Sequence, residues 1–289
     1  MRYYRCTPDL EPRLVVRNGD GTYDLTSVHE DLRTVSQLLS AARLSGEPLT
    51  GITETLLEDA ETLAFDDCED DLVLPLQPAE VWAAGVTYEI SEKAREDEST
   101  LPDVYQYVYT ADRPELFFKS TPNRLSGPAD HVGVRDDSSW NVPEPELGVV
   151  IYQDETVGYT IGNDVSSREI EGENPLYLPQ AKVYDRSCSI GPCFVPADEV
   201  TDPHDLDMSM QIHRDGGVVW EGSTSTAQMV RTCEELVSFY RRSNDLPALS
   251  VLLTGTSLVP EEGTTLKAGD TVRIEIESIG VLENPVMTV

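Results

Sequence analysis

Two prolines that alternate with two glutamates restrict the middle of the chain more than any other segment. In "VPEPELGVVI", residues 142–151, each proline fixes its own φ angle and keeps the residue before it out of the helical region. The segment is therefore extended, and the apolar run after it predicts a strand buried in a sheet. Because residues i and i+2 of a strand project to the same side, we expect the carboxylates of Glu144 and Glu146 to face one direction.

Two carboxylates held side by side repel one another unless a cation lies between them. A cation site is therefore one interpretation of Glu144 and Glu146. The other is an exposed acidic strand edge, because the chain has 53 Asp and Glu against 21 Lys and Arg. The apolar residues that follow make a freely solvated position less suitable for Glu146. Both interpretations stay open on this segment alone.

The formal net charge of −32 excludes some classes of partner. Such a surface repels nucleic acid and anionic membranes, so neither is expected to bind. Hydrophobic residues make up 39% of the chain and occur in short, regularly spaced runs, which argues against intrinsic disorder. We interpret the surplus of acids as the solvated surface of a halophilic protein.

Cysteine usage and the N-terminal segment indicate a soluble cytoplasmic protein. The five cysteines form no C-x-x-C pair and are odd in number, so neither a disulfide framework nor a thiolate zinc site is predicted. Residues 1–16 have the pattern of a strand rather than of a secretion signal. No run approaches the roughly 20 apolar residues that a membrane helix requires.

The pattern of turns and apolar residues divides the chain near residue 72. Residues 1–72 are expected to form a small α/β domain that ends in the acidic stretch "FDDCEDD". The elements predicted there are a strand at 13–16, a turn at "NGDGTYDL" into a second strand, and helices at 31–43 and 52–62.

Residues 73–289 are expected to form the second domain, mostly from short strands and turns. The elements predicted there are a strand at 81–86, helices at 89–97, 102–110 and 226–242, and a hairpin at 264–286. The helix at 226–242 is predicted to pack on the core through one apolar face, made of Met229, Val230, Cys233, Leu236, Val237 and Tyr240.

A third carboxylate follows an alternating strand in "VGYTIGNDVSSREIEG", residues 157–172. At a strand end Asp164 can point into a cleft, but an Asx turn or the cap of a helix in "VSSRE" explains it equally well. Together with Glu144 and Glu146 it would complete a set of three oxygen ligands. That set suits Mg²⁺ or Mn²⁺, with water or substrate in the remaining positions.

Only four lysines occur, so each is a candidate for a role beyond solvation. Lys182, in "AKVYDRSCSIGP", could bind a substrate carboxylate or move protons beside the carboxylates, and the alternative is a surface lysine. In "ELFFKS", residues 115–120, two phenylalanines lie between Glu115 and Lys119. This arrangement is compatible with a pocket wall and equally with plain core packing.

Several other chemistries are not supported by the sequence. The four histidines are scattered, so a His-rich zinc site and a Ser-His-Asp hydrolase are not expected. No P-loop or glycine-rich dinucleotide motif is present, so no nucleotide cofactor is predicted.

Five segments resemble motifs of the fumarylacetoacetate hydrolase family, in the same order along the chain. They are "EPELGVVI", "GYTIGNDVSSRE", "AKVYDRSCSIGP", "LLTGTSLVP" and "LKAGDTVRIEIESIGVLENPV". The resemblance covers residues 75–289 and implies an α+β fold whose core is a mixed β-roll with a divalent metal at its mouth. By motif position it also implies the metal ligands Glu144, Glu146 and Asp164, the active-site lysine Lys182, and Thr256 near the substrate carboxylate.

Hydrolytic members of this family carry a histidine after the first core strand, whereas "AAGVTYEISEKARE", residues 83–96, has none. Activation of water by a His-Glu pair is therefore not expected. The segment and "ELFFKSTPNR" instead resemble the branch that dehydrates a 2-keto-3-deoxy-pentonate (xylonate or arabinonate) to 2,5-dioxopentanoate, α-ketoglutarate semialdehyde, in oxidative pentose degradation. This resemblance implies Mg²⁺ or Mn²⁺ as cofactor, proton transfer by Lys182 and Glu115, and a sugar acid contacted by Thr87, Tyr88 and Lys119.

Two other functions stay open. One keeps the fold and the metal but hydrolyses acylpyruvates or fumarylacetoacetate, or decarboxylates oxaloacetate. The other is a non-catalytic cation- or carbohydrate-binding domain whose acidic clusters belong only to a halophilic surface. The family resemblance also implies a homodimer or homotetramer, with residues 1–72 serving packing or assembly.

Overall fold

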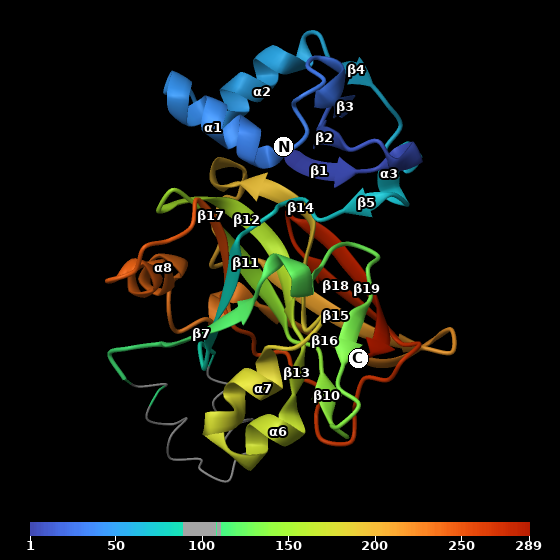
Figure 1. Ribbon diagram of the computed structural model, residues 1–289, viewed down its shortest axis with the longest axis vertical. Coiled ribbons are helices and arrows are strands. Elements are labelled where there is room, and N and C mark those ends of the chain that lie inside the picture. The colour runs from blue at the N-terminus through green and yellow to red at the C-terminus, as the bar shows by residue number, and fades with distance from the viewer. Residues whose placement is uncertain (89–107, 109–110) are drawn as a thin grey trace.

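The computed structural model describes residues 1–88, 108 and 111–289. The fold is α+β, as expected, and its body consists of two β-sheets (Figure 1). The helix predicted at 89–97, and the one at 102–110 apart from Val108, lie outside the described residues. Within the described ranges, no helix is long and apolar enough to cross a membrane.

The larger sheet has twelve strands among the described residues. In chain order they are β1 (Arg2–Cys6), β2 (Arg13–Asn18), β3 (Gly21–Asp24), β4 (Glu61–Thr62), β5 (Leu72–Val73), β6 (Glu80–Gly85), β7 (Glu115–Ser120), β8 (Leu125–Ser126), β11 (Pro145–Tyr152), β12 (Glu155–Asp164), β14 (Cys188–Pro196) and β17 (Leu249–Leu253). The spatial order is β4-β3-β2-β1-β14-β12-β11-β17-β6-β7, with β5 paired to β1 and β8 paired to β14. The predicted strands at 13–16 and 81–86 are therefore confirmed as β2 and β6.

The second sheet has five strands in the order β16-β15-β18-β19-β9. They are β9 (Val132–Val134), β15 (Asp207–Arg214), β16 (Gly217–Ser225), β18 (Thr271–Ile276) and β19 (Gly280–Thr288), while β10 (Asn141–Val142) and β13 (Ser166–Ser167) form a separate ribbon. The hairpin predicted at 264–286 is confirmed, because β18 and β19 pair antiparallel from Thr271↔Pro285 to Ile276↔Gly280.

Six α-helices lie in the described part of the chain. They are α1 (Val35–Ser45), α2 (Leu49–Leu57), α3 (Asp66–Glu69), α6 (Arg168–Glu173), α7 (Leu178–Lys182) and α8 (Cys233–Arg241). Short 3-10 helices are η1 (Pro8–Leu10), η2 (Leu25–Ser27), η3 (Pro122–Arg124), η4 (Pro175–Tyr177), η5 (Ala197–Glu199) and η6 (Thr226–Gln228).

The predicted helices of the first 72 residues exist, with shifted ends. The helix predicted at 31–43 begins only at Val35, because Thr34 and Gln37 form a capping box before it, and it ends at Gly46 in the left-handed conformation (φ 74°). The helix predicted at 52–62 runs from Leu49 to Leu57.

The helix predicted at 226–242 begins seven residues later than expected. Thr232 caps α8 by accepting a hydrogen bond from the backbone N–H of Glu235, so the helix starts at Cys233. The placement of Val230 on the core face is therefore wrong, since its side chain lies outside the helix and is 47% exposed. Met229 also precedes the helix, and it is partly buried against the core. The other four residues of the predicted face are confirmed, with Cys233, Leu236, Val237 and Tyr240 buried.

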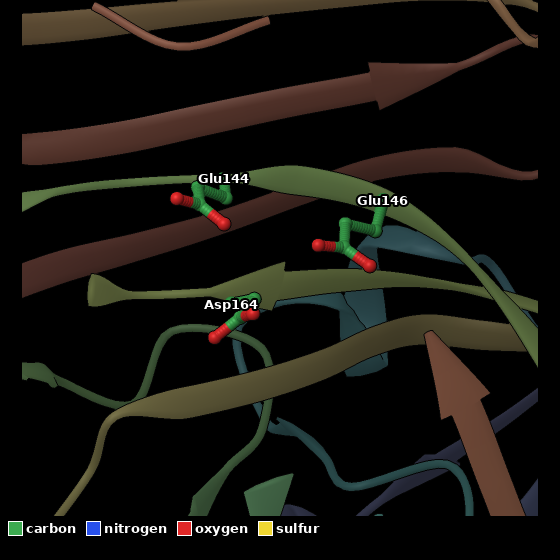
Figure 2. Close-up of side chains that lie close together, drawn as sticks. All are labelled: Glu144, Glu146 and Asp164. Atoms are coloured by element: carbon green, nitrogen blue, oxygen red, sulfur yellow. The ribbon is translucent and has the colours of Figure 1, made fainter. Parts of the chain in front are cut away.

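Strands β11 and β12 are neighbours in the middle of the larger sheet. They pair antiparallel, with Leu147 opposite Ile161 and Glu146 opposite Gly162. The start of β11 and the end of β12 therefore lie side by side, and three acidic side chains gather there (Figure 2).

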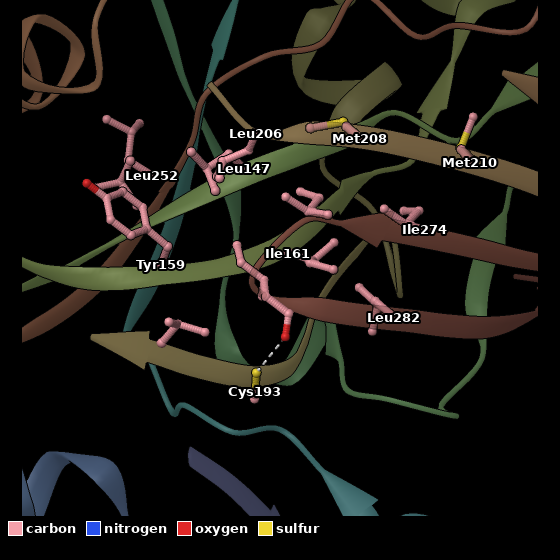
Figure 3. Close-up of a cluster of buried hydrophobic side chains, with 14 of the residues drawn as sticks. Leu147, Tyr159, Ile161, Cys193, Leu206, Met208, Met210, Leu252, Ile274 and Leu282 are labelled. Atoms are coloured by element: carbon pink, nitrogen blue, oxygen red, sulfur yellow. Dashed lines mark hydrogen bonds between the residues drawn. The ribbon is translucent and has the colours of Figure 1, made fainter. Parts of the chain in front are cut away.

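All eight residues of β11 are buried, and five of them divide between two hydrophobic clusters, with Leu147, Val149 and Ile151 in the first and Val150 and Tyr152 in the second. Leu147 and Val149 point into the first cluster, which joins the two sheets through residues such as Met208, Ile274 and Leu282 (Figure 3). The strand predicted from the apolar run at 147–151 is thus confirmed as fully buried on both faces.

The second hydrophobic cluster joins the central strands to the first 72 residues. It holds Val150 and Val251 together with Tyr3, Leu14 and Leu38. Strand β1 also pairs with β14, so the N-terminal segment continues the larger sheet. Figure 1 shows α1 and α2 at one end of the molecule and α6 and α7 at the opposite end. The domain division near residue 72 stays a prediction.

Candidate metal centre

Three carboxylates from two neighbouring strands converge beneath the surface. Glu144 immediately precedes β11, Glu146 is its second residue, and Asp164 ends β12 (Figure 2). Oxygen atoms of the three groups lie within 4.8 Å of one another. The exposed fractions are 3% for Glu144 and 1% each for Glu146 and Asp164, so the interpretation as an exposed acidic edge is wrong.

Backbone hydrogen bonds hold these residues in place. The N–H of Asp164 donates to the carbonyl of Glu144 at 2.9 Å, and the N–H of Glu144 donates to Oδ1 of Asn163 at 3.1 Å. The alternative role of Asp164 as a helix cap is not observed, since the side chain of Ser167 caps α6 by accepting from the N–H of Ile170. The Asp164 side chain is therefore left to point at the two glutamates.

Lys182, the last residue of α7, lies against two of the carboxylates. Its Nζ is 2.7 Å from Oε2 of Glu144 and 3.0 Å from Oδ2 of Asp164, and the side chain is fully buried. Burial lowers the pKa of Lys182, but the charges of Asp164 and Glu144 outweigh it and raise the pKa above its usual value. The ammonium also lies 5.5 Å from the ring centroid of Phe117. The interpretation as a surface lysine is wrong.

Lys119 holds Asp164 and the backbone around it in position. Its ammonium forms an ion pair with Oδ1 of Asp164 and donates to the carbonyls of Val165 at 2.9 Å and Lys182 at 2.6 Å. Two of the three ammonium hydrogens are therefore donated to carbonyls, and the charge is paired with Asp164. The geometry therefore favours a positioning role for Lys119, which ties β7 to the ends of β12 and α7. Direct contact with a substrate stays a prediction.

Two further charged residues belong to the centre and were missed by the sequence analysis. Arg168 opens α6, and its Nη2 lies 2.9 Å from Oε1 of Glu144 while its Nη1 lies 3.3 Å from Oε2 of Glu171. Both side chains are about as buried as the carboxylates, with 5% of Arg168 and 4% of Glu171 exposed. The signal was present in "SSREIE", where a serine cap is followed by Arg and Glu at helical i,i+3 spacing.

Glu146 is held by a turn that only glycine can form. The N–H of Gly255 donates to Oε2 of Glu146 at 2.6 Å, with Gly255 at φ +84°. A Cβ on Gly255 would lie 2.0 Å from Oγ1 of Thr87, too close for any other residue. Burial raises the pKa of Glu146 well above its usual value, the charges of Asp164 and Glu144 add to this, and Lys182 and the Gly255 N–H offset part of it.

The carboxylates line a small cavity that suits a single cation. Its volume is about 10 Å³, which is room for about one water-sized sphere. Three buried carboxylate oxygens form a hard ligand set of the kind that Mg²⁺ or Mn²⁺ prefers. The described residues around the cavity are Ala84, Gly85, Val86, Glu144, Glu146, Asp164, Arg168, Gly255, Thr256 and Val259.

Of the residues expected to contact substrate, Thr256 lines this cavity, and its hydroxyl accepts the N–H of Leu258 at 3.0 Å. Thr87 is buried and donates its hydroxyl to the carbonyl of Thr254 at 2.7 Å. Tyr88 is buried nearby, where burial and then the charge of Glu146 raise the pKa of its phenol. Glu115 is the partly buried first residue of β7. The roles of all four residues stay predictions.

The chain is similar to a known family and to two dehydratases. The model of a family described as fumarylacetoacetate (FAA) hydrolase C-terminal matches residues 80–287. Over 289 residues, all of both chains, the sequence is 54% identical to a probable 2-keto-3-deoxyxylonate dehydratase of Haloferax volcanii. It is 42% identical over 247 residues to the 2-dehydro-3-deoxy-D-arabinonate dehydratase of Saccharolobus solfataricus, which covers 83% of this chain and 81% of the relative.

A solved structure shares the fold over the whole chain. It is that of a 2-keto-3-deoxy-D-arabinonate dehydratase complexed with magnesium and 2,5-dioxopentanoate, with a TM-score of 0.82 and 33% sequence identity. The match covers 100% of this chain and 99% of the other.

Proposed function

Because this chain belongs to the fumarylacetoacetate hydrolase family, we propose that it is a metal-dependent hydro-lyase that converts a 2-keto-3-deoxy-pentonate into 2,5-dioxopentanoate. The observation that carries the proposal is the buried triad of Glu144, Glu146 and Asp164 in a chain with end-to-end similarity to a dehydratase. The pentonate is the derivative of xylonate or arabinonate, and the reaction belongs to oxidative pentose degradation.

Mg²⁺ is the proposed ion, with Mn²⁺ as a substitute, and the three carboxylates are its proposed ligands. The described cavity accommodates one ion, and the similar solved structure is described as a magnesium complex. When bound, a divalent cation polarises the carboxylate and C2 carbonyl oxygens of a 2-keto acid and so acidifies its C3 protons.

The side chains around this position supply orientation and proton transfer. The net reaction removes one proton from C3 and the hydroxyl from C4 as water. A proton shift from C5 to C3 and a second shift from the C5 hydroxyl to C4 then give the terminal aldehyde. We assign proton transfer to Lys182, whose ammonium contacts Glu144 and Asp164, and to Glu115. Arg168 and Lys119 position Glu144 and Asp164, and Thr256 is placed to contact the substrate from the cavity wall.

The test is incubation with 2-keto-3-deoxy-xylonate and 2-keto-3-deoxy-arabinonate, with and without Mg²⁺, and measurement of 2,5-dioxopentanoate. We expect Mg²⁺-dependent formation of the semialdehyde, and the faster substrate identifies the physiological configuration. Turnover of acylpyruvate, fumarylacetoacetate or oxaloacetate without any dehydration would overturn the proposal.

A matched pair of variants separates the enzyme from a non-catalytic cation-binding domain. Glu146→Gln should abolish dehydration, whereas Glu155→Gln, at the exposed start of β12, should leave it unchanged. An active Glu146→Gln variant with unchanged Mg²⁺ affinity would contradict the assignment of the centre.

The cellular setting remains part of the proposal. We propose a halophilic enzyme of the cytoplasm, supported by the net charge of −32 and by five free cysteines. A homodimer or homotetramer is proposed on the family resemblance, and sedimentation in concentrated KCl would establish the assembly.

A further inference from the structure

Arg168 lies in the wall of the metal cavity, yet its charge is already engaged by two carboxylates. One nitrogen of the guanidinium faces Glu144 at 2.9 Å and another faces Glu171 at 3.3 Å. The three side chains are at most 5% exposed, so water screens these charges little. Glu171 thus places a carboxylate against Arg168, next to the residues that line the cavity.

The spacing along α6 keeps Glu171 in this position. Residues i and i+3 of a helix lie on the same face, and Arg168 and Glu171 have this spacing. An arginine in a cavity wall is otherwise well suited to bind a ligand carboxylate with both arms of its guanidinium. A second carboxylate on a ligand that approached Arg168 would also approach Glu171.

The other buried charges of the centre also bear on whether a second ligand carboxylate can bind. Among the described residues, seven buried charged side chains form what we call the charge network, namely Lys119, Glu144, Glu146, Asp164, Arg168, Glu171 and Lys182. One ligand carboxylate would face the divalent cation. A second ligand carboxylate that approached Arg168 would bring another negative charge close to Glu171 in a buried position, which is unfavourable.

We propose that Glu171 makes this centre selective for 2-keto acids with one carboxylate and against those with two. The proposal rests on the proposed function only in that a 2-keto acid binds at the metal centre. Glu171 acts through Arg168 and is therefore a positioning residue. Its carboxylate offsets part of the guanidinium charge, so less of that charge is left to attract a ligand.

The test compares two ligands with the same five-carbon skeleton. 2-Oxopentanoate carries one carboxylate and 2-oxoglutarate carries two, and neither has the C4 hydroxyl that dehydration removes. Dissociation constants are measured by titration calorimetry in Mg²⁺ at constant ionic strength. We expect the wild-type protein to bind 2-oxopentanoate at least about tenfold more tightly than 2-oxoglutarate.

Three variants sharpen the comparison. Glu171→Gln keeps the shape and removes the charge, so the ratio of the two dissociation constants should shift at least about tenfold towards 2-oxoglutarate. Glu171→Asp keeps the charge and should retain most of the wild-type preference. Glu173→Gln, an exposed residue of the same helix, should leave the ratio unchanged.

An unchanged ratio in a folded Glu171→Gln variant would overturn the proposal. Should that variant not fold, equal binding of both ligands by the wild-type protein would overturn it as well. If the ratio shifts in Glu171→Gln but the wild-type protein dehydrates no pentonate, the proposed function is wrong and the role of Glu171 is supported. If the wild-type protein dehydrates a pentonate but binds both ligands equally, the proposed function is supported and the role of Glu171 is wrong.

Discussion

Acidic side chains occupy two opposite environments in this molecule. Residues 66–71, around α3, carry five exposed carboxylates, whereas Glu144, Glu146 and Asp164 are at most 3% exposed. On the surface each carboxylate keeps its water, and nearby charges are screened by salt. In the buried group each carboxylate depends on Lys119, Lys182, Arg168 or a metal for compensation. The same residue type is therefore solvated in one region and held by buried ion pairs in the other.

The comparison predicts its largest effect on metal binding. Glu146→Gln should weaken Mg²⁺ affinity by at least about 100-fold, because it removes one of the three proposed carboxylate ligands. The matched surface change, Asp67→Asn, should leave the affinity within about twofold, because an exposed charge is screened from the buried centre. Titration calorimetry measures both, and similar losses in the two variants would contradict the separation of the two environments.

A second prediction concerns folding stability. Lys119→Met should lower the free energy of unfolding by about 3–5 kcal/mol, because it removes the cation at Oδ1 of Asp164 and leaves two buried carbonyls without this donor, while only Lys182 remains beside Asp164. Lys267→Met alters an exposed lysine and should change it by less than about 0.5 kcal/mol. Urea unfolding in excess Mg²⁺ gives both values. A loss below about 1 kcal/mol for Lys119→Met would mean that this lysine behaves as a surface residue.

The pH dependence of the metal-free protein offers a third comparison. Burial and then the charges of Asp164 and Glu144 raise the folded-state pKa of Glu146 well above its usual 4.5. A raised folded pKa stabilises the fold below the unfolded value, and this contribution is lost as the pH rises through the folded one. Unfolding of chelator-treated protein from pH 5 upwards should therefore show a declining stability that is flatter in Glu146→Gln. Parallel curves for wild type and Glu146→Gln would refute this.

The smallest effect is expected at Glu169, a partly exposed acid beside the centre. The N–H and hydroxyl of Ser139 hold the pKa of Glu169 below its usual value. This contact stabilises the protein above the unfolded pKa and is lost as the pH falls through the folded one. Glu169→Gln should lower the melting temperature by less than about 2 °C at pH 7 and leave Mg²⁺ affinity unchanged. A large loss of metal binding would show that Glu169 belongs functionally to the buried group.

Local rules predicted the backbone of the centre better than its side-chain partners. The alternation of a strand placed Glu144 and Glu146 on one side, and a strand end placed Asp164 beside them. Neither rule reveals that Lys119 turns its ammonium towards the carbonyl of Lys182, because these residues meet only in the folded chain. The sequence analysis missed Arg168 for the same reason. In the sequence it resembles any other charged residue of a short helix, and its contact with Glu144 forms only in the folded chain.

The limits of local rules are also visible at helix ends. The late start of α8 depends on which of several threonines caps it, and Thr232 does so here. Apolar spacing alone extended the predicted helix back to residue 226, and this error placed Val230 in the core.

The second hydrophobic cluster determines when this protein can finish folding during synthesis. Tyr3, Leu14 and Leu38 leave the ribosome early, but Val150 and Val251, which cover them, are made much later. The N-terminal segment must therefore wait with an apolar face uncovered until β17 has emerged, and contacts so distant in sequence form slowly. The second cluster is thus completed late in synthesis, and the first 72 residues made alone should associate through that face until residues 73–289 are supplied.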